Sequence, residues 1–558
     1  MKSSLLRRFA PTFLLALLAT LLAAGCVTTE IAPPPRPKLV VFLVVDGLPQ
    51  WQVVDYRDQL APDGLRRFLD HGAWFADAYY GHAFTVTGAG HAAMLTGAYP
   101  HRTGIIGNDW RDRASGETVY CTGDPAYIYL ENKTAPLAGT SPRNLLVESL
   151  GDVLRRTHPA ARVIGISGKD RGAILPAGKT GTAYMYMAGS GTCASSTYYM
   201  KEHPAWVKAF NAAKPADRYF KTTWTLLLAE AAYARSIPDE RPWYNPGGKL
   251  PKVFGAGSDK PGPVFYASLL PSPYADELTL DFARAAIEGD GLGQDNVTDI
   301  LSVSLSGHDY INHAWGAESR LSQDHLLRLD RMLAEFFADL DRLVGRDNYI
   351  AVLTADHGFM PAPEYSKTLG RDAGRVNLPQ LMARLNEGLA AKFGPGRWAR
   401  FWSASGVMLD DALIAKSGVD RRALEAETRR LLLTEAGVAA AFTREDILGT
   451  KQPANTPFLA QVRNTWHRDR SSDVQVVIKP YWLAETRRTY ASTHGSPHAY
   501  DSHVPILFWG PRWFGAGRVD GRVEVVDIAP TLARFLEISP PAASEGKLLP
   551  LPPLQRAR

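Results

Sequence analysis

The chain has 558 residues, of which 45% are hydrophobic and 21% are charged. It is too long for one ordinary small domain, and its composition is typical of a folded enzyme with a large buried core. The formal net charge is +5, and it falls to +2 once the basic residues of the first 25, Lys2, Arg7 and Arg8, are set aside. This near-balance gives no reason to expect a nucleic-acid partner.

The N-terminus predicts an exported protein. Residues 1–25 have the features of a signal peptide, because the basic residues precede the short apolar run Phe13–Leu22 and small residues follow it. Ala23-Ala24-Gly25-Cys26 resembles a bacterial lipobox, which predicts lipidation of Cys26 and an outer-membrane anchor. A simple cleaved signal, which leaves the protein in the periplasm, is the alternative, and the apolar run is short for a transmembrane anchor. Residues 26–37 form a Pro-rich tether.

Two cysteines remain once Cys26 is assigned to the export signal. They are Cys121 and Cys193. Exported proteins commonly oxidise such pairs, so one disulfide is expected. Two separate buried thiols are the alternative.

Apolar runs typical of buried strands recur along the chain and alternate with helical segments. They are Val40–Val45, Arg162–Ser167, Asp299–Leu305, Tyr349–Thr354 and Val504–Gly510. This alternation predicts an α/β fold with a doubly wound, mostly parallel sheet flanked by helices. Open sheets of this kind bind ligands at the carboxyl ends of their parallel strands.

We expect residues 38–540 to form one catalytic domain and residues 541–558 to form a C-terminal tail. Two stretches, about 180–295 and about 362–485, fit the alternation less well, and we interpret them as insertions that cover the active face. The second contains a predicted helix, Arg421–Glu435, and a predicted strand, Val474–Ile478. A terminal helix is expected from Val526 to Leu532.

Carboxylate and imidazole side chains follow three of the predicted strands. Asp46 follows the first, Asp356 and His357 follow another, and Asp309 and His313 are spaced to share one face of a helical turn. Oxygen and imidazole ligands suit zinc. Two zinc ions roughly 4 Å apart can clamp both the attacking and the leaving oxygen of a phosphoryl transfer. These residues, with a later histidine, therefore predict a two-zinc site.

A candidate nucleophile lies in the segment Phe84–His91, where threonines precede small residues and a helix-like run. A hydroxyl at a helix N-terminus lies where free N–H groups and the helix dipole favour anions. An N-cap threonine is the alternative interpretation. On these grounds Thr85 and Thr87 cannot be separated.

The motifs resemble a known family. Thr87-Gly88-Ala89-Gly90-His91, with Thr96-Gly97, Pro100–Ile105 and Asn108, is similar to the nucleophile region of the nucleotide pyrophosphatase/phosphodiesterase group of the alkaline phosphatase superfamily. The family spacing between threonine and histidine selects Thr87. Gly168–Ala173, which contains Lys169 and Arg171, is similar to the bacterial threonine-nucleophile alkaline phosphatases.

The resemblance implies a role for each matching residue. One zinc ion would be held by Asp46, Asp356 and His357 together with Thr87. The other would be held by Asp309, His313 and a late histidine, which the pattern His494-Gly495-Ser496-Pro497 places at His494, with His498 in reserve. Non-bridging phosphate oxygens would be bound by Asn108, Lys169 and Arg171. His91 is expected to shape the nucleophile helix rather than to bind metal.

The expected function is therefore a zinc-dependent phosphate monoester hydrolase, an alkaline phosphatase. Thr87 would attack phosphorus to give a phospho-threonine, which is then hydrolysed. A phosphodiesterase or nucleotide pyrophosphatase of the same superfamily is one alternative, and a non-catalytic cell-surface binding protein is another. The expected partners are small phosphate monoesters, and we expect the chain to act as a monomer.

Overall fold

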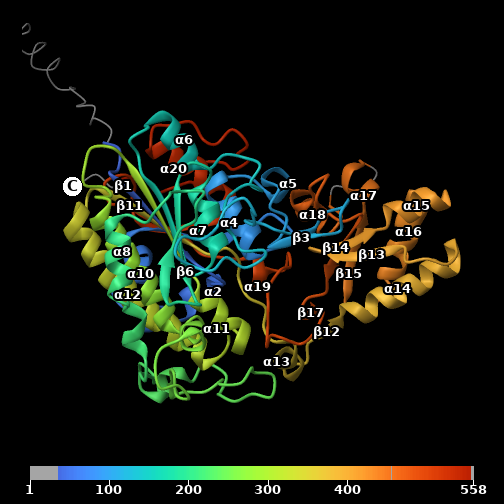
Figure 1. The fold of residues 1–558 in the computed structure, drawn as a ribbon, viewed down its shortest axis with the longest axis horizontal. Helices are drawn as coiled ribbons and strands as arrows, with labels where there is room; N and C mark the ends of the chain where they lie inside the picture. The colour runs from blue at the N-terminus through green and yellow to red at the C-terminus, as the bar shows by residue number, and fades with distance from the viewer. Residues whose placement is uncertain (1–34, 451, 454, 555–558) are drawn as a thin grey trace, which may run out of the picture. The chain divides into compact units, whose positions relative to one another are not determined.

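A nine-stranded sheet forms the centre of the computed structural model, which describes residues 35–450, 452–453 and 455–554 (Figure 1). The strands run in the order β19 (Gly517–Glu524), β2 (Ala73–Tyr79), β18 (Ile506–Trp509), β11 (Tyr349–Thr354), β1 (Leu39–Val45), β10 (Asp299–Leu305), β5 (Val163–Ser167), β6 (Thr182–Met187) and β7 (Thr192–Ala194). The five strands from β11 to β6 are parallel, whereas β18 and β7 run antiparallel to their neighbours. The predicted fold class, a mostly parallel α/β sheet, is confirmed.

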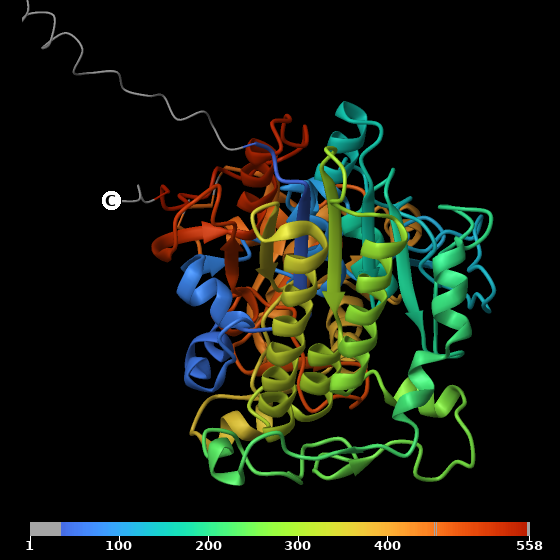
Figure 2. The same cartoon turned by 90° about the vertical axis from the view of Figure 1, so that its left-hand side faces the viewer.

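Helices cover both faces of this sheet. On one face lie α10 (Pro273–Gly289), α12 (Arg320–Leu340) and α3 (Leu65–His71), and α10 and α12 cross in front of the sheet in Figure 2. On the other face lie α4 (Thr87–Thr96), α6 (Leu150–Thr157), α7 (Asp170–Ala177) and α20 (Ile528–Phe535). The central strands β1, β10 and β11 are buried along their whole length. Burial on both faces explains why their sequences are nearly continuous apolar runs.

The segment expected to be the second insertion has a sheet of its own. Strands β13 (Ala399–Ser403), β14 (Gly406–Leu409), β16 (Val474–Ile478) and β15 (Val438–Thr443) form it in that order, and they lie to the right in Figure 1. Helices α14 (Leu378–Phe393) and α16 (Arg421–Leu432) bury Leu381, Leu385 and Leu424 against it, so the segment has a separate hydrophobic core.

The segment about 180–295 differs from the expected insertion at both of its ends. Strands β6 and β7 at its start belong to the central sheet, and α10 at its end packs on β10 and β5. The sequence of β6, Thr-Ala-Tyr-Met-Tyr-Met, lacks the valine and isoleucine run that marks its parallel neighbours. The central part holds the short strands β8 (Thr223–Trp224) and β9 (Lys252–Val253).

The expected disulfide is wrong, because Cys121 and Cys193 are two free, buried thiols. Cys121 packs in a cluster with Ile105 and Trp110, whereas Cys193 lies in β7 opposite Tyr186. The two thiols therefore belong to different parts of the core, and burial raises the pKa of Cys121 to about 12.

The predicted signal peptide, Cys26 and most of the tether lie outside the described residues. Within the described ranges, we find no helix whose length and apolar character would suit a membrane span.

Candidate active site

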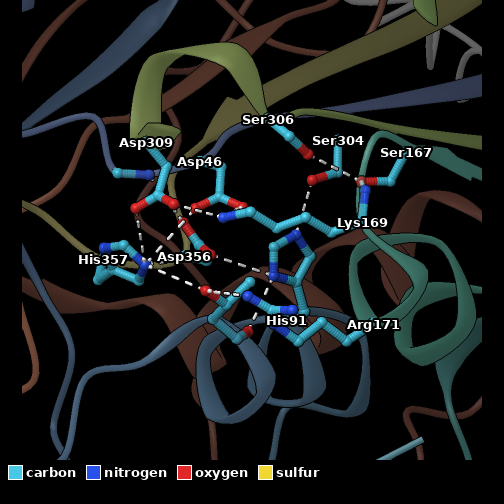
Figure 3. Close-up of polar contacts among 12 residues, drawn as sticks. Asp46, His91, Ser167, Lys169, Arg171, Ser304, Ser306, Asp309, Asp356 and His357 are labelled. Carbon is cyan, nitrogen blue, oxygen red and sulfur yellow. Dashed lines mark hydrogen bonds and ion pairs between the residues drawn. The ribbon is translucent and has the colours of Figure 1, made fainter. Parts of the chain in front are cut away.

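The chemistry-bearing residues meet at the carboxyl ends of four adjacent parallel strands (Figure 3). Asp46 directly follows β1, and Lys169 follows β5 by two residues. Asp309 lies in the first turn of α11 (Gly307–Trp315), which follows β10. Asp356 and His357 come after β11. All five side chains are buried.

Two overlapping groups of these residues could each hold a metal ion. In the first, Nε2 of His357 lies 3.5 Å from Oδ1 of Asp46 and 3.4 Å from Oδ2 of Asp356. The second group joins Asp309, His357 and His494, with Nε2 of His494 at 3.6 Å from Oδ1 of Asp309. The rings of His357 and His494 stack, with centroids 3.3 Å apart, so the two groups are contiguous.

His313 and His498 lie in different surroundings. Nε2 of His313 is 3.4 Å from Oδ1 of Asp309, one helical turn away, so His313 borders the second group. His498, the reserve ligand, instead has its Nε2 at 2.8 Å from the carbonyl oxygen of Ile478. The structure thus brings His494, and not His498, to the carboxylates.

Backbone carbonyls orient the three site histidines in the same way. Nδ1 of His313 donates to the carbonyl of Ser492 at 3.1 Å. Nδ1 of His357 donates to the carbonyl of Gly358, and Nδ1 of His494 to that of Thr85, both at 2.9 Å. A carbonyl only accepts, so each Nδ1 carries the proton and each Nε2 lone pair faces the carboxylates. Burial also lowers the pKa of all three imidazoles. Neutral histidines held in this way are suited to metal ligation.

The carboxylates are short of partners. Within the described residues, Oδ1 of Asp46, Oδ1 of Asp309 and Oδ2 of Asp356 are buried and accept no hydrogen bond. Buried polar atoms normally have a partner. Burial and the charge of Asp356 raise the pKa of Asp46 well above its usual value. The ammonium of Lys169 approaches Asp46 and Asp309, at 2.8 and 2.5 Å. Three carboxylates against one ammonium leave an excess of negative charge, which fits a site for metal cations.

Thr87 begins helix α4 beside this cluster. Its Oγ1 lies 3.5 Å from Nε2 of His357 and receives a hydrogen bond of 3.3 Å from Nη2 of Arg171. The helix approaches the metal-site backbone closely, since a Cβ on Gly90 would lie 2.1 Å from the carbonyl oxygen of Asp356. Thr85 is used differently, because its hydroxyl donates to the carbonyl of Ser496. The structure therefore separates the two threonines.

A cavity of about 430 Å³ opens onto Thr87. Asn108, Arg171, His313 and His494 line it on the side of the main sheet. Residues of the segment 362–485 also line it, among them Trp402, Gln475 and Trp482. The segment 362–485 thus contributes to the cavity that opens onto Thr87.

The sequence of this site matches a family model described as type I phosphodiesterase / nucleotide pyrophosphatase, over residues 40–501. The chain belongs to this family. A protein named "Calcium-transporting ATPase" from Myroides odoratus is 34% identical over 92% of this chain and 94% of its own length. "Alkaline phosphatase PafA" from Elizabethkingia meningoseptica is 33% identical over 92% of this chain and 94% of its own length. A crystal structure of wild-type alkaline phosphatase PafA superposes with a TM-score of 0.85, at 32% identity over 92% of this chain and 98% of that chain. The family resemblance inferred from the motifs is confirmed.

One histidine of the family motif supports helix α4. Nδ1 of His91 donates to the carbonyl of Thr87 at 2.9 Å and lies 3.3 Å from Oδ2 of Asp356. Its Nε2 lies 2.8 Å from the hydroxyl of Ser304 in β10. His91 thus ties α4 to the sheet without facing the cavity.

Three contacts at this site have no signal in the sequence. Ser304 contacts Nε2 of His91, Asp170 accepts the N–H of Arg171, and Tyr120 accepts a hydrogen bond from Nη1 of Arg171 at 3.1 Å. A tyrosine at the end of a short strand is common, so its approach to an arginine 51 positions later becomes visible only in three dimensions.

Proposed function

We propose that this chain is a zinc-dependent alkaline phosphatase, a phosphate monoester hydrolase that acts through a phospho-threonine on Thr87. One observation carries the proposal: Thr87 lies at a helix N-terminus between an arginine and a cluster of neutral histidines and of carboxylates that keep unbonded oxygens. Its relatives support it, since PafA and the 31% identical "Alkaline phosphatase PhoK" of Sphingomonas sp are both named alkaline phosphatases.

The donor set fits two zinc ions. Asp46, Asp356, His357 and Thr87 would hold one, because oxygen and imidazole are ligands that zinc accepts. The other would be held by Asp309, His313 and His494. Bound there, the ions would supply positive charge to the attacking and leaving oxygens of the phosphoryl transfer.

The protein groups around Thr87 organise the reaction. Oγ1 of Thr87 forms the new bond to phosphorus, and the bond to the leaving alcohol breaks. Water then cleaves the phospho-threonine, which releases phosphate and restores the hydroxyl. The first N–H groups of α4 and the guanidinium of Arg171 face the charge that develops on the phosphoryl oxygens. Oδ1 of Asn108 accepts the N–H of Gly88 at 2.7 Å, which leaves the amide NH₂ of Asn108 to donate to the substrate.

The cations beside Thr87 favour a monoester. A monoester carries one more negative charge on its phosphoryl oxygens than a diester, and a planar guanidinium can pair with two of these oxygens. Arg171 is half-buried and its Nε is unbonded within the described residues, so its protein contacts do not use all of the guanidinium's donors. The buried ammonium of Lys169 adds a second positive charge close by.

Two other functions compete. A phosphodiesterase would keep the same metal ligands and Thr87, and the family description names that activity. A non-catalytic binding protein would have no need of an intact ligand set beside a threonine at a helix N-terminus. Intact ligands therefore disfavour the second alternative, and Lys169 and Arg171 disfavour the first.

Turnover by the zinc-loaded protein tests the proposal. We expect kcat/KM for an aryl phosphate monoester to exceed that for the matching diester, and Arg171→Ala to reduce mainly the monoester value. Equal or faster turnover of the diester by the wild-type protein would favour the phosphodiesterase. Turnover of neither ester would favour the binding protein.

We further propose that the protein is exported, is anchored by a lipid on Cys26, and acts on small phosphate monoesters as a monomer. The basic residues, the apolar run and the small residues before Cys26 support this. Cys26→Ser should release the protein from the membrane fraction of the producing bacterium. Unchanged membrane association of the variant would rule out the lipid anchor.

A further inference from the structure

A short hairpin connects Asn108, which lines the cavity at Thr87, to Tyr120, which contacts Arg171. Strands β3 (Asp109–Arg111) and β4 (Thr118–Tyr120) pair antiparallel, with Asp109 opposite Tyr120. Asn108 directly precedes β3, and its carbonyl accepts the N–H of Cys121 at 2.9 Å. The hairpin therefore carries Asn108 at one end and Tyr120 at the other.

The hydroxyl of Tyr120 connects Arg171 to Asp170. It donates to Oδ1 of Asp170 at 2.5 Å and accepts from Nη1 of Arg171 at 3.1 Å. A phenol has a single proton, and an ionised carboxylate can only accept, so the direction of both bonds is fixed. The other end of the same guanidinium donates from Nη2 to Oγ1 of Thr87 at 3.3 Å. Tyr120 and Thr87 thus hold the two terminal nitrogens of one arginine.

Backbone groups fix Asp170 in turn. Its Oδ1 also accepts the N–H of Arg171 at 2.5 Å, and its Oδ2 accepts the N–H of Gly139 at 2.9 Å. Because these donors belong to the main chain, Asp170 is a rigid acceptor for the tyrosine. Nε of Arg171 donates no hydrogen bond within the part of the chain that the structure describes. Loss of the tyrosine hydroxyl would therefore leave the guanidinium with a single side-chain acceptor there.

We propose that Tyr120, held by Asp170, is a positioning residue that aims the guanidinium of Arg171 at the transferred phosphoryl group. The inference rests on the phosphate-binding role proposed above for Arg171. An arginine side chain has many rotamers, and fixing its planar fork before substrate arrives removes an entropic cost from binding. Tyr120 lies behind Arg171 and lines a different cavity from the one that opens onto Thr87. It therefore acts through Arg171 and does not touch the substrate.

This role makes Tyr120 a determinant of selectivity between esters. The bidentate pairing that Arg171 can offer is worth most with a monoester, which has three unsubstituted phosphoryl oxygens to share. A diester has one fewer, so it gains less from a well-aimed guanidinium. Because the same hairpin carries Asn108 and Tyr120, it holds Asn108 directly and orients Arg171 through Tyr120.

Tyr120→Phe tests the inference, because it removes one oxygen and keeps the ring. In the zinc-loaded protein we expect kcat/KM for an aryl phosphate monoester to fall about tenfold, and that for the matching diester to change less than about twofold. Inhibition by inorganic phosphate should weaken in parallel. The control is Tyr199→Phe, which removes a buried hydroxyl with no hydrogen-bond partner in the described residues from a ring packed near α7, and it should leave all three values unchanged.

A double-mutant comparison separates positioning from a general structural effect. In an Arg171→Ala background, Tyr120→Phe should cause no further loss, since its only route to the substrate is gone. A further loss of similar size, or equal losses on monoester and diester, would overturn the inference. So would unchanged turnover of Tyr120→Phe in the wild-type background.

A second variant and a second substrate cover the cases in which Tyr120→Phe does not fold or the wild-type protein prefers the diester. Should Tyr120→Phe fail to fold, Asp170→Asn, which weakens the acceptor that holds the tyrosine, is expected to give the same substrate-selective loss and the same non-additivity with Arg171→Ala. If the wild-type protein prefers the diester, the proposed function fails, but the double-mutant comparison on that substrate still decides whether Tyr120 acts through Arg171.

Discussion

Nζ of Lys169 lies 2.5 Å from Oδ2 of Asp309, and both side chains are buried. Burial disfavours the charged form of each side chain, but the attraction between the ammonium and the carboxylate outweighs this cost. The carboxylates of Asp309 and Asp46 raise the pKa of Lys169, and the ammonium of Lys169 holds the pKa of Asp309 well below its usual value. The ammonium therefore compensates carboxylates that are proposed to bind metal.

Removing this ammonium should destabilise the metal-free protein more than the zinc-loaded protein. Lys169→Met keeps the length of the side chain and leaves buried carboxylates uncompensated, which costs about 3–5 kcal/mol. Urea unfolding of chelator-treated protein measures this loss, and the zinc-loaded protein should lose less because the ions supply positive charge. Lys208→Met, which removes an exposed ion pair with Glu202, is the control and should leave stability nearly unchanged. Equal losses with and without zinc would contradict the compensating role.

The two threonines should respond differently to substitution. Thr87→Ala removes the proposed nucleophile and should abolish nearly all monoester turnover, whereas Thr87→Ser keeps a hydroxyl and should retain part of it. Thr85→Val removes only the hydrogen bond to Ser496 and preserves the carbonyl that orients His494. Its kcat/KM should stay within about tenfold of the wild type. An inactive Thr85→Val with an active Thr87→Ala would reverse the assignment.

His494 and His498 can be distinguished by metal content. His494→Ala removes an imidazole whose Nε2 lies 3.6 Å from Asp309, so elemental analysis should find one zinc ion fewer per chain. His498→Ala is the matched control, because that ring bonds to the carbonyl of Ile478, and it should keep the wild-type zinc content. Loss of zinc from His498→Ala alone would show that the ligand assignment is wrong.

The cysteines should titrate as free thiols. Protein purified and denatured without reductant should react with a thiol reagent at both Cys121 and Cys193. Their burial should protect both from the reagent in the native protein. If neither thiol of the mature domain reacts after denaturation, the two cysteines form a disulfide and their assignment as free thiols is wrong.

The sequence was informative where local pattern decides structure. Continuous apolar runs predicted the buried strands β1, β10 and β11, and the rule for parallel sheets then brought Asp46, Asp309 and Asp356 to one edge. The sequence does not predict the direction of individual side chains or the contacts between residues far apart in the chain. Nothing in the spacing indicated that Lys169 lies between two carboxylates, or that Tyr120 supports Arg171.

The errors have the same physical origin. Cys121 and Cys193 suggested a disulfide by number and export, but pairing requires proximity, which the fold does not provide. The stretch about 180–295 fits the strand–helix alternation poorly and predicts an insertion, but β6 at its start lies in the central sheet, where Ala183, Tyr184 and Met185 are buried. Its tyrosines and methionines do not form the valine-rich run of its neighbours.

Zinc titration of chelator-treated protein, followed by turnover of an aryl phosphate monoester, tests the central claim most directly. The account predicts little activity without metal and a rise that reaches its plateau at two zinc ions per chain, with the monoester preferred over the matching diester throughout. Full activity in the absence of metal, or a plateau at one ion per chain, would contradict the two-zinc site.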